Sequence, residues 1–207
     1  MITSLSDKKR GIPMSKKNDR NTKGKIITAA WDLFYEQGYD DTTVEEIIAK
    51  SGTSKGSFYH YFEGKDSLLG SLSYIFDEEY ERLRDNFPDG MPSFEKLLFL
   101  NSELFAMIED RIDRDLLTRL YSSQLITKGE KHLLDNKRIY YKLLRSIVSE
   151  GQKSGELTDK MTVSEIVKLY AMCERALIYD WCLCNGEYSL KNYAKNLMPM
   201  LLSGIRV

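Results

Sequence analysis

A chain of 207 residues is long enough for one small and one medium domain with a buried core. Its 42% apolar and 29% charged residues are typical of a globular protein, and no apolar run approaches the roughly 18 residues of a membrane-spanning helix. The polar N-terminus lacks the apolar stretch of a signal peptide, so we expect a cytoplasmic protein with no membrane partner.

The net charge of −1 hides an asymmetry along the chain. Residues 1–25 carry eight Lys or Arg against two Asp or Glu, whereas the remainder carries 22 against 29. A basic leading segment on an acidic body is expected where one end of a protein meets phosphate. A disordered basic arm over residues 1–20 explains the pattern equally well, and Met14 offers a second start of translation besides Met1.

The first helical pattern in the chain has clear ends. Apolar residues at helical spacing predict a helix over 22–37, which Gly38 is placed to end. Thr43 and Glu46 then form a capping box, in which each side chain satisfies a free amide of the other residue. This box predicts a short second helix that ends near Ser51.

A second short helix follows directly after a turn. Gly52 makes the turn, and Ser54 can cap a third helix over 55–62. Apolar periodicity next predicts one long helix over 66–86, followed by the clearest loop of the chain at 88–92.

The rest of the chain also has helical periodicity, without the alternating patterns of strands. The further amphipathic stretches are 93–108, 113–126, 130–153, 162–184 and 189–204. The prediction is therefore an all-α fold of about nine helices. We expect a DNA-binding domain over 21–81 and a larger helical ligand-binding and dimerisation domain over 82–207.

The two short helices form a helix–turn–helix arrangement over 43–62. On a helical wheel, Phe58, Tyr61 and Phe62 fall on one side of the second helix, which we expect to face the core. The opposite side presents bare backbone, hydroxyls, a phenol and an imidazole, from Gly56, Ser57, Tyr59 and His60. These groups suit a DNA groove, although periodicity alone fits an ordinary helical hairpin equally well.

The same segment carries a recognisable motif. It reads TTVEEIIA from Thr42, SGTSKGSFYHYF from Ser51 and KDSLL from Lys65, after a helix with Ala29-Ala30, Leu33-Phe34 and Gly38-Tyr39. Over about residues 22–80 this closely resembles the signature of the tetracycline-repressor (TetR) family. The remaining residues carry no such motif and fit the family in being helical, of suitable length and C-terminal.

The resemblance implies a homodimeric, sequence-specific transcription regulator, usually a repressor, whose third helix enters the major groove of double-stranded DNA at a palindromic operator. It also implies a C-terminal domain that binds a small-molecule effector and releases the DNA. Carried over by position, the expected DNA contacts are Thr43, Lys55, Gly56, Ser57, Tyr59, His60 and Lys65. Phe58 and Phe62 are the expected core anchors, and His60-Tyr61 reverses an order common in relatives, which leaves the phosphate donor there open.

The C-terminal part has enough aromatic residues to line a ligand cavity. Thirteen Tyr against eight Phe favour a cavity with hydroxyls, for an aromatic or amphipathic effector, although the ligand-binding residues stay unknown at this level. A ligand that prefers a different spacing of the two recognition helices would shift the protein from its DNA-binding state. The long helix over 66–86 is the expected lever for that shift.

The last two helices are the expected dimer interface. Pairing two such helices from each protomer gives a four-helix bundle, which the resemblance also implies. The two apolar stripes are Ile166, Leu169, Cys173, Ala176 and Leu177, and Leu190, Tyr193, Ala194, Leu197, Leu201 and Gly204.

Two alternatives to a ligand-released repressor stay open. Cys173, Cys182 and Cys184 suggest a thiol- or soft-metal-sensing regulator, but Cys182 and Cys184 point in different directions on a helix, which favours a role as small apolar filler. A ligand-independent DNA-binding activator also fits, because the sign of regulation depends on where the operator lies. We find no nucleophile–base pair, metal signature or phosphate-cradling glycine loop, so we expect neither an enzyme nor a metal or cofactor.

Overall fold

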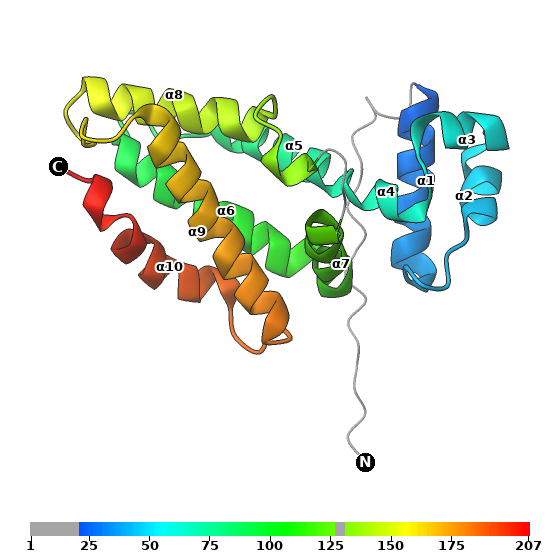
Figure 1. The fold of residues 1–207 in the computed structure, drawn as a ribbon. Coiled ribbons are helices and arrows are strands. Elements are labelled where there is room, and N and C mark those ends of the chain that lie inside the picture. The colour runs from blue at the N-terminus through cyan, green and yellow to red at the C-terminus, as the bar shows by residue number, and fades with distance from the viewer. Residues whose placement is uncertain (1–20, 127–130) are drawn as a thin grey trace, which may run out of the picture. The chain divides into compact units, whose positions relative to one another are not determined.

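The computed structural model describes residues 21–126 and 131–207, and the all-α prediction is confirmed (Figure 1). The predicted basic arm and the second start at Met14 lie outside the described residues. The helices are α1 (Thr22–Gln37), α2 (Val44–Ser51), α3 (Lys55–Tyr61), α4 (Lys65–Leu69), α5 (Leu72–Arg84), α6 (Ser93–Arg111), α7 (Arg114–Ile126), α8 (Ile139–Lys153), α9 (Val163–Leu183) and α10 (Leu190–Leu201), with short 3-10 turns η2 (His132–Leu134) and η3 (Ser203–Ile205).

The chain divides into two compact units. The first contains the described residues up to Ser71 together with Asp110–Ser123, and the second contains Leu72–Glu109 and Gln124–Val207. The division falls at Ser71, earlier in the chain than the domain boundary expected at residue 81. The helix–turn–helix of α2 and α3 therefore lies in the first unit, and α9 and α10 lie in the second.

The first unit begins with the helices that the local signals predicted. Asn21 caps α1 by accepting from the Gly24 amide at 2.7 Å, and Gly38 ends the helix with a φ of +93°. The capping box of Thr43 and Glu46 is present at the start of α2. The buried side chains include Trp31, Phe34, Ile47, Phe58 and Leu68.

The end of α3 differs from the helical wheel. Phe58 and Phe62 are buried as predicted, but Tyr61 is 42% exposed. Tyr61 lies at the edge of the apolar arc and is the last residue of α3, so the buried side of this short helix is occupied by the two phenylalanines.

The long helix expected over 66–86 is wrong, because it is broken into α4 and α5. Gly70 and Ser71 separate the two helices. The Ser71 hydroxyl accepts from the indole nitrogen of Trp31 at 2.7 Å and donates to the Leu68 carbonyl at 2.5 Å. The break falls at one of the points where the two units divide, so the segment over 66–86 does not join the units as one continuous helix.

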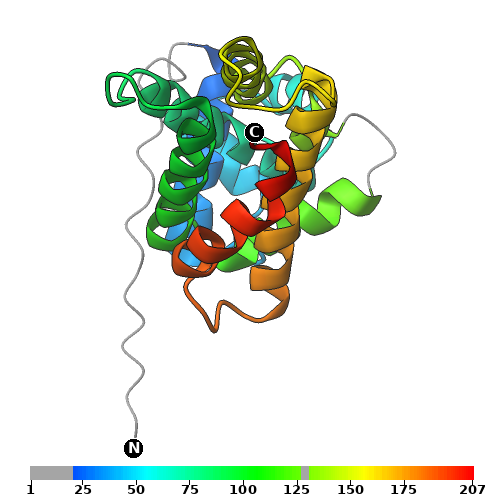
Figure 2. The same cartoon turned by 90° about the vertical axis from the view of Figure 1, so that its left-hand side faces the viewer.

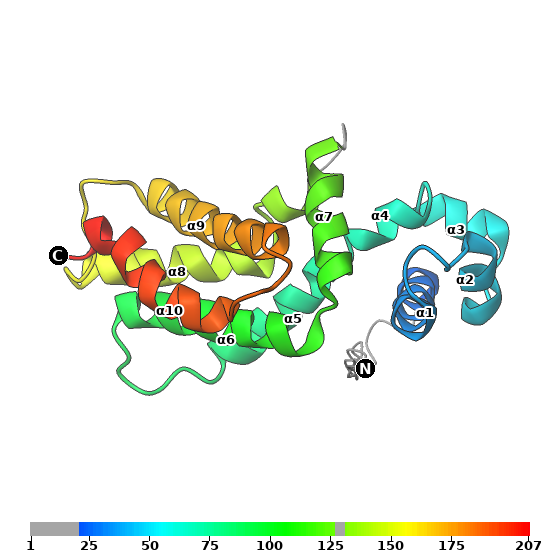
Figure 3. The ribbon, with the colours of Figure 1, turned by 90° about the horizontal axis from the view of Figure 1, so that it is seen from below.

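In the second unit, α9 packs against α8 and against α10, and α5 packs against α8 (Figures 2 and 3). The close packing requires a glycine at position 151 of α8. A Cβ added there would lie 2.7 Å from side-chain atoms of both Leu157 and Ser93. The C-terminal end of α8 is therefore packed closely against the start of α6 and the segment that follows α8.

Candidate DNA interface and effector site

The outward face of α3 is exposed in the structure. Lys55, Gly56, Tyr59 and His60 all reach solvent, and Tyr59 is 49% exposed although its ring is large and partly apolar. Ser57 is half-buried, because its amide and hydroxyl bond to the Ser54 side chain at 3.0 and 2.9 Å. The four exposed residues thus come from one short helix whose buried anchor is Phe58 on the opposite side.

Gly56 lies in open space at the start of α3. An added Cβ would meet only the Ser54 hydroxyl oxygen, at 3.9 Å, and the backbone at Gly56 does not adopt a positive φ. Neither packing nor backbone geometry within the chain therefore requires glycine here. Glycine in a helix costs roughly 0.5–1 kcal/mol relative to alanine, which indicates a reason outside the folded chain itself.

Lys55 is a cation available to a partner. Its ammonium lies 3.8 Å from the Glu45 carboxylate, with both side chains about 70% exposed, and 6.0 Å from the centre of the Tyr59 ring. An exposed ion pair of this kind contributes little, about 0–1 kcal/mol. A phosphate can therefore replace Glu45 as the partner of Lys55 at small cost.

Thr43 and Lys65 have partners inside the first unit. The Thr43 hydroxyl accepts from the Glu46 amide at 3.2 Å and donates to the Glu46 carboxylate at 2.8 Å. The Lys65 ammonium donates to the backbone carbonyls of Tyr39, Thr42 and Asp40 at 2.6, 2.8 and 3.3 Å. These three bonds use the donors of one ammonium group, so Lys65 holds the turn between α1 and α2.

The same turn is held from α7. The Arg119 guanidinium lies 2.6 Å from the Asp40 carboxylate and 4.8 Å from the centre of the Tyr39 ring. The Lys65 ammonium lies 4.3 Å from the centre of the same ring, and the Tyr39 hydroxyl donates to Asp66. The turn before the helix–turn–helix is therefore fixed by charged groups from two other helices of the first unit.

A buried polar cluster lies at the centre of the second unit. The Glu174 carboxyl is 3% exposed and accepts from the Tyr140 hydroxyl at 2.6 Å, the Asn101 amide at 3.1 Å and the Tyr80 hydroxyl at 3.4 Å. Burial raises the pKa of Glu174 above its ordinary value, because removal from water disfavours the carboxylate. Tyr170 donates to the Leu97 carbonyl beside it, at 2.9 Å. Sequence analysis did not single out this acid.

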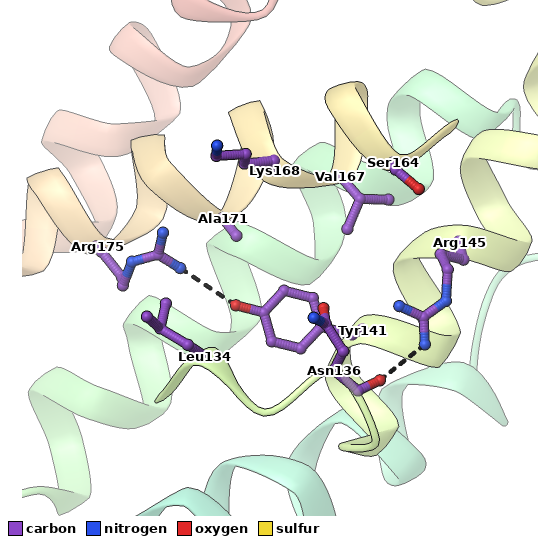
Figure 4. Close-up of a pocket in the computed structure, with 9 residues that line it drawn as sticks. All are labelled: Leu134, Asn136, Tyr141, Arg145, Ser164, Val167, Lys168, Ala171 and Arg175. Carbon is purple, nitrogen blue, oxygen red and sulfur yellow. Dashed lines mark hydrogen bonds between the residues drawn. The ribbon is translucent and has the colours of Figure 1, made fainter. Parts of the chain in front are cut away.

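The second unit also has a groove of about 400 Å³ between α8, α9 and the segment before α8 (Figure 4). Of the aromatic residues expected to line a ligand cavity, Tyr141 lines this groove. The lining residues are Leu134, Asn136, Tyr141, Arg145, Ser164, Val167, Lys168, Ala171 and Arg175.

The apolar stripes expected at the dimer interface are partly internal. Ile166, Leu177, Leu190 and Ala194 are buried within the chain itself, because α9 and α10 use these positions to pack against their own neighbours. The large apolar side chains left exposed on α9 and α10 are Met172, Tyr179, Leu183, Tyr193, Met200 and Leu201. On α9 the exposed apolar side chains therefore lie at positions other than the expected stripe, whereas on α10 Tyr193 and Leu201 of that stripe stay exposed.

The cysteines do not form a sensing centre in the described part of the chain. Burial raises the pKa of the Cys173 thiol, and the same effect together with the nearby Asp180 carboxylate raises that of Cys184. A raised pKa keeps a thiol protonated and unreactive. Among the residues described, no three His, Cys, Asp or Glu side chains gather as a metal site, and no helix is long and apolar enough to cross a membrane.

An exposed helix–turn–helix in one helical unit and a ligand-sized groove in another define a ligand-responsive DNA-binding regulator. Residues 26–72 match the family model described as bacterial regulatory proteins of the tetR family, and residues 76–204 match that of the C-terminal region of YsiA-like proteins. The chain therefore belongs to the TetR family, as the motif predicted. It is a ligand-responsive repressor rather than an enzyme, and the thiol-sensing alternative is not supported.

Several relatives extend over nearly the whole chain. The fatty acid metabolism regulator protein of Bacillus subtilis is 25% identical over 184 residues, which cover 87% of this chain and 93% of that protein. The crystal structure of FadR from Bacillus subtilis in complex with stearoyl-CoA has a TM-score of 0.64 at 23% identity and covers 88% of this chain and 98% of that one. Thermus thermophilus FadR in complex with lauroyl-CoA has a TM-score of 0.68 at 21% identity, with coverages of 88% and 94%.

Proposed function

We propose that two copies of this chain bind a palindromic operator through α3 and leave it when an acyl-coenzyme A thioester binds the second unit. The observation that carries the DNA-binding half is Gly56, an exposed helical glycine that the chain's own packing does not require. In a DNA groove, the missing side chain lets the start of α3 approach base edges and phosphates closely.

The groups around Gly56 support the same role. Lys55, Tyr59 and His60 are exposed beside it and supply an ammonium, a phenol and an imidazole as donors to phosphate oxygens. Thr43, the cap of α2, and Ser57, whose amide donates to the Ser54 cap of α3, add hydroxyl groups to this surface. We leave Lys65 out of the proposed interface, because its three donors are directed at backbone carbonyls.

The proposed dimer forms through α9 and α10. Met172, Tyr179 and Leu183 lie seven and four residues apart, so they form one exposed stripe along α9. Exposed apolar groups on α10 continue this surface, including Met200 at 70% exposure. Pairing both helices with their copies covers these side chains and gives the four-helix arrangement expected from sequence. Two α3 helices must then lie about 34–36 Å apart to enter successive major grooves.

The proposed effector class follows from the relatives and from the second unit. The related FadR proteins were crystallised with stearoyl-CoA and lauroyl-CoA, which are amphipathic molecules with an apolar chain and a polyanionic head. The second unit of this chain has the complementary character, with a tyrosine-containing core and a cationic groove. An acyl-CoA that favours a spacing of the α3 helices unsuited to DNA shifts the population of dimers away from the operator.

The first experiment is a mobility-shift titration of the DNA upstream of the gene that encodes this chain, across a salt series. We expect saturable binding to a palindrome that weakens with salt, and release by long-chain acyl-CoA. Lys55→Ala is expected to lower the slope of log K against log salt by about 1, because one phosphate contact is lost. Tyr59→Ala is expected to weaken binding with little change in folding, since Tyr59 is exposed.

Lys153→Ala is the matched control, because Lys153 is an exposed cation at the end of α8 in the second unit. If Lys55→Ala and Lys153→Ala weaken operator binding equally, then only the net charge of the protein matters. That result would contradict the proposed α3 interface. For the dimer, Leu183→Glu is expected to yield monomers in sedimentation equilibrium, whereas Lys142→Glu on the exposed side of α8 leaves dimers intact.

A further inference from the structure

The groove between α8 and α9 has a cationic rim. Arg145 extends from α8, and Lys168 and Arg175 extend from α9. The groove residues of α9, from Ser164 through Lys168 and Ala171 to Arg175, recur at spacings of four, three and four, which place them along one side of the helix. No acidic residue lines the groove.

No acidic partner balances the charge of these three cations among the described residues, and the hydrogen-bond partners of the two arginines are neutral oxygens. Arg145 donates to the Asn136 carbonyl at 2.9 Å, and Arg175 donates to the Tyr141 hydroxyl at 3.3 Å (Figure 4). No carboxylate among the described residues lies within 4.0 Å of Arg145, Lys168 or Arg175. Three positive charges in a concave site without an acid attract an anion of more than one charge.

The floor of the groove is mainly apolar. Tyr141, Val167 and Ala171 are buried side chains that form it. Figure 4 shows the Tyr141 ring in the middle, with Arg175 at its hydroxyl end and Arg145 on the other side. The two arginines are thus separated by apolar side chains, which suits a ligand that carries more than one separate anionic group.

We propose that this groove binds the phosphorylated nucleotide portion of the effector, with phosphate groups on Arg145, Lys168 and Arg175 and the nucleoside against the apolar side chains between them. The inference deepens the proposed function and rests on it for the effector class. Coenzyme A has the required form, since its adenosine carries a 3′-phosphate and a 5′-diphosphate. A fatty acid offers a single carboxylate and would leave two of the three cations without a partner.

The position of the groove also connects it to the proposed dimer surface. Ala171 lies in the groove floor, whereas the next residue, Met172, is 51% exposed on the apolar stripe of α9. Successive residues of a helix point about 100° apart, so the two surfaces adjoin on α9. A nucleotide in the groove therefore contacts the helix that sets how two copies pair.

The test is isothermal titration calorimetry of the full chain with coenzyme A and with adenosine 3′,5′-bisphosphate. Unphosphorylated adenosine and a fatty acid serve as comparison ligands. We expect both phosphorylated probes to bind, with adenosine far weaker. Arg145→Gln and Lys168→Gln are each expected to weaken binding about tenfold, and the double variant about a hundredfold. Lys153→Gln, at an exposed cation outside the groove, is the matched control, and thermal unfolding verifies that every variant is folded.

The outcomes separate the groove from the proposed function. Failure of both phosphorylated probes to bind at low salt, or binding that the groove variants leave unchanged, overturns the site even if acyl-CoA releases the operator. The nucleotide site is also overturned if Lys168→Gln weakens dimerisation and the wild type binds neither phosphorylated probe, because the groove would then be a contact surface for a second chain. If the phosphorylated probes bind and the groove variants abolish that binding, the site is supported. Should acyl-CoA then fail to release the DNA, only the proposed effector response is contradicted.

Discussion

The buried carboxyl of Glu174 offers a test of how the second unit is held together. Hydroxyls from α5 and α8 and an amide from α6 converge on it, so its replacement affects four helices at once. Glu174→Ala removes the acceptor of Tyr140 and Asn101 and leaves a cavity between them. Glu174→Gln keeps the shape, and its carbonyl oxygen still accepts from Tyr140 while the Asn101 amide rotates to accept from the new NH₂ group.

The size of the effect follows from the hydrogen bonds. A buried donor left without an acceptor costs about 1–3 kcal/mol, and a cavity adds to that cost. Two close donors, Tyr140 and Asn101, lose their acceptor in Glu174→Ala, so we expect a loss of about 4 kcal/mol in the free energy of unfolding. At about 2–4 °C per kcal/mol for a chain of this size, the melting temperature falls by about 10 °C. Glu174→Gln is expected to cost about 1 kcal/mol or less.

The two variants also differ in how stability depends on pH. The folded pKa of Glu174 lies above its unfolded value, because burial disfavours the charged form. Stability from this group is therefore complete below the unfolded pKa and is lost as pH rises through the folded pKa. Glu174→Gln cannot ionise, so its stability should fall less than that of the wild type over the same rise in pH.

Urea unfolding followed by circular dichroism, at fixed protein concentration and at several pH values, measures both effects. A Gln variant as unstable as the Ala variant would refute the hydrogen-bond reasoning, because shape and acceptor are both retained. A Gln variant with the same pH slope as the wild type would refute the assignment of Glu174 as the titrating group.

Three further substitutions test the first unit and the packing of the second. Gly56→Ala is expected to stabilise the fold by about 0.5 kcal/mol in urea unfolding and yet weaken operator binding in the mobility-shift assay; unchanged binding would contradict close approach of α3 to DNA. Lys65→Met is expected to lower the free energy of unfolding by about 1–3 kcal/mol, because three backbone carbonyls lose their donor. Unlike Lys55→Ala, it should leave the salt slope of DNA binding unchanged. The control Lys50→Met, which removes a surface ion pair, should cost less than about 1 kcal/mol. Gly151→Ala is expected to cost about 1–3 kcal/mol in urea unfolding by overpacking, and a neutral result would mean that its neighbours move aside readily.

The DNA-binding helices were predictable because their signals are local. The predicted bounds of the first helix coincide with α1, and the Thr43–Glu46 box starts α2 as expected. Each of these signals acts within four residues of the helix end that it defines. The outward face of α3 followed from the same short-range geometry, since Phe58 and Phe62, four residues apart, define the buried side.

The break between α4 and α5 was not predictable in the same way. Apolar periodicity continues through Gly70 and Ser71, so the pattern favours one helix. The Ser71 hydroxyl instead bonds to Trp31, forty residues earlier in the chain. A single glycine inside a helical pattern costs only about 1 kcal/mol, so whether it ends a helix depends on such distant contacts.

Distant contacts also decide which side of each C-terminal helix faces the protein core, even more than they decide the break between α4 and α5. On α9, the sequence pattern does not distinguish apolar residues that pack inside the chain, such as Ile166 and Leu177, from those left exposed, such as Met172 and Tyr179. The same helix carries Glu174 toward the core, cations toward the groove and an exposed apolar stripe on a third side. Because one helix borders all three environments, a rotation or shift of α9 would alter all three together. This makes α9, rather than a continuous helix over 66–86, the element through which we expect an effector to alter the pairing of two copies.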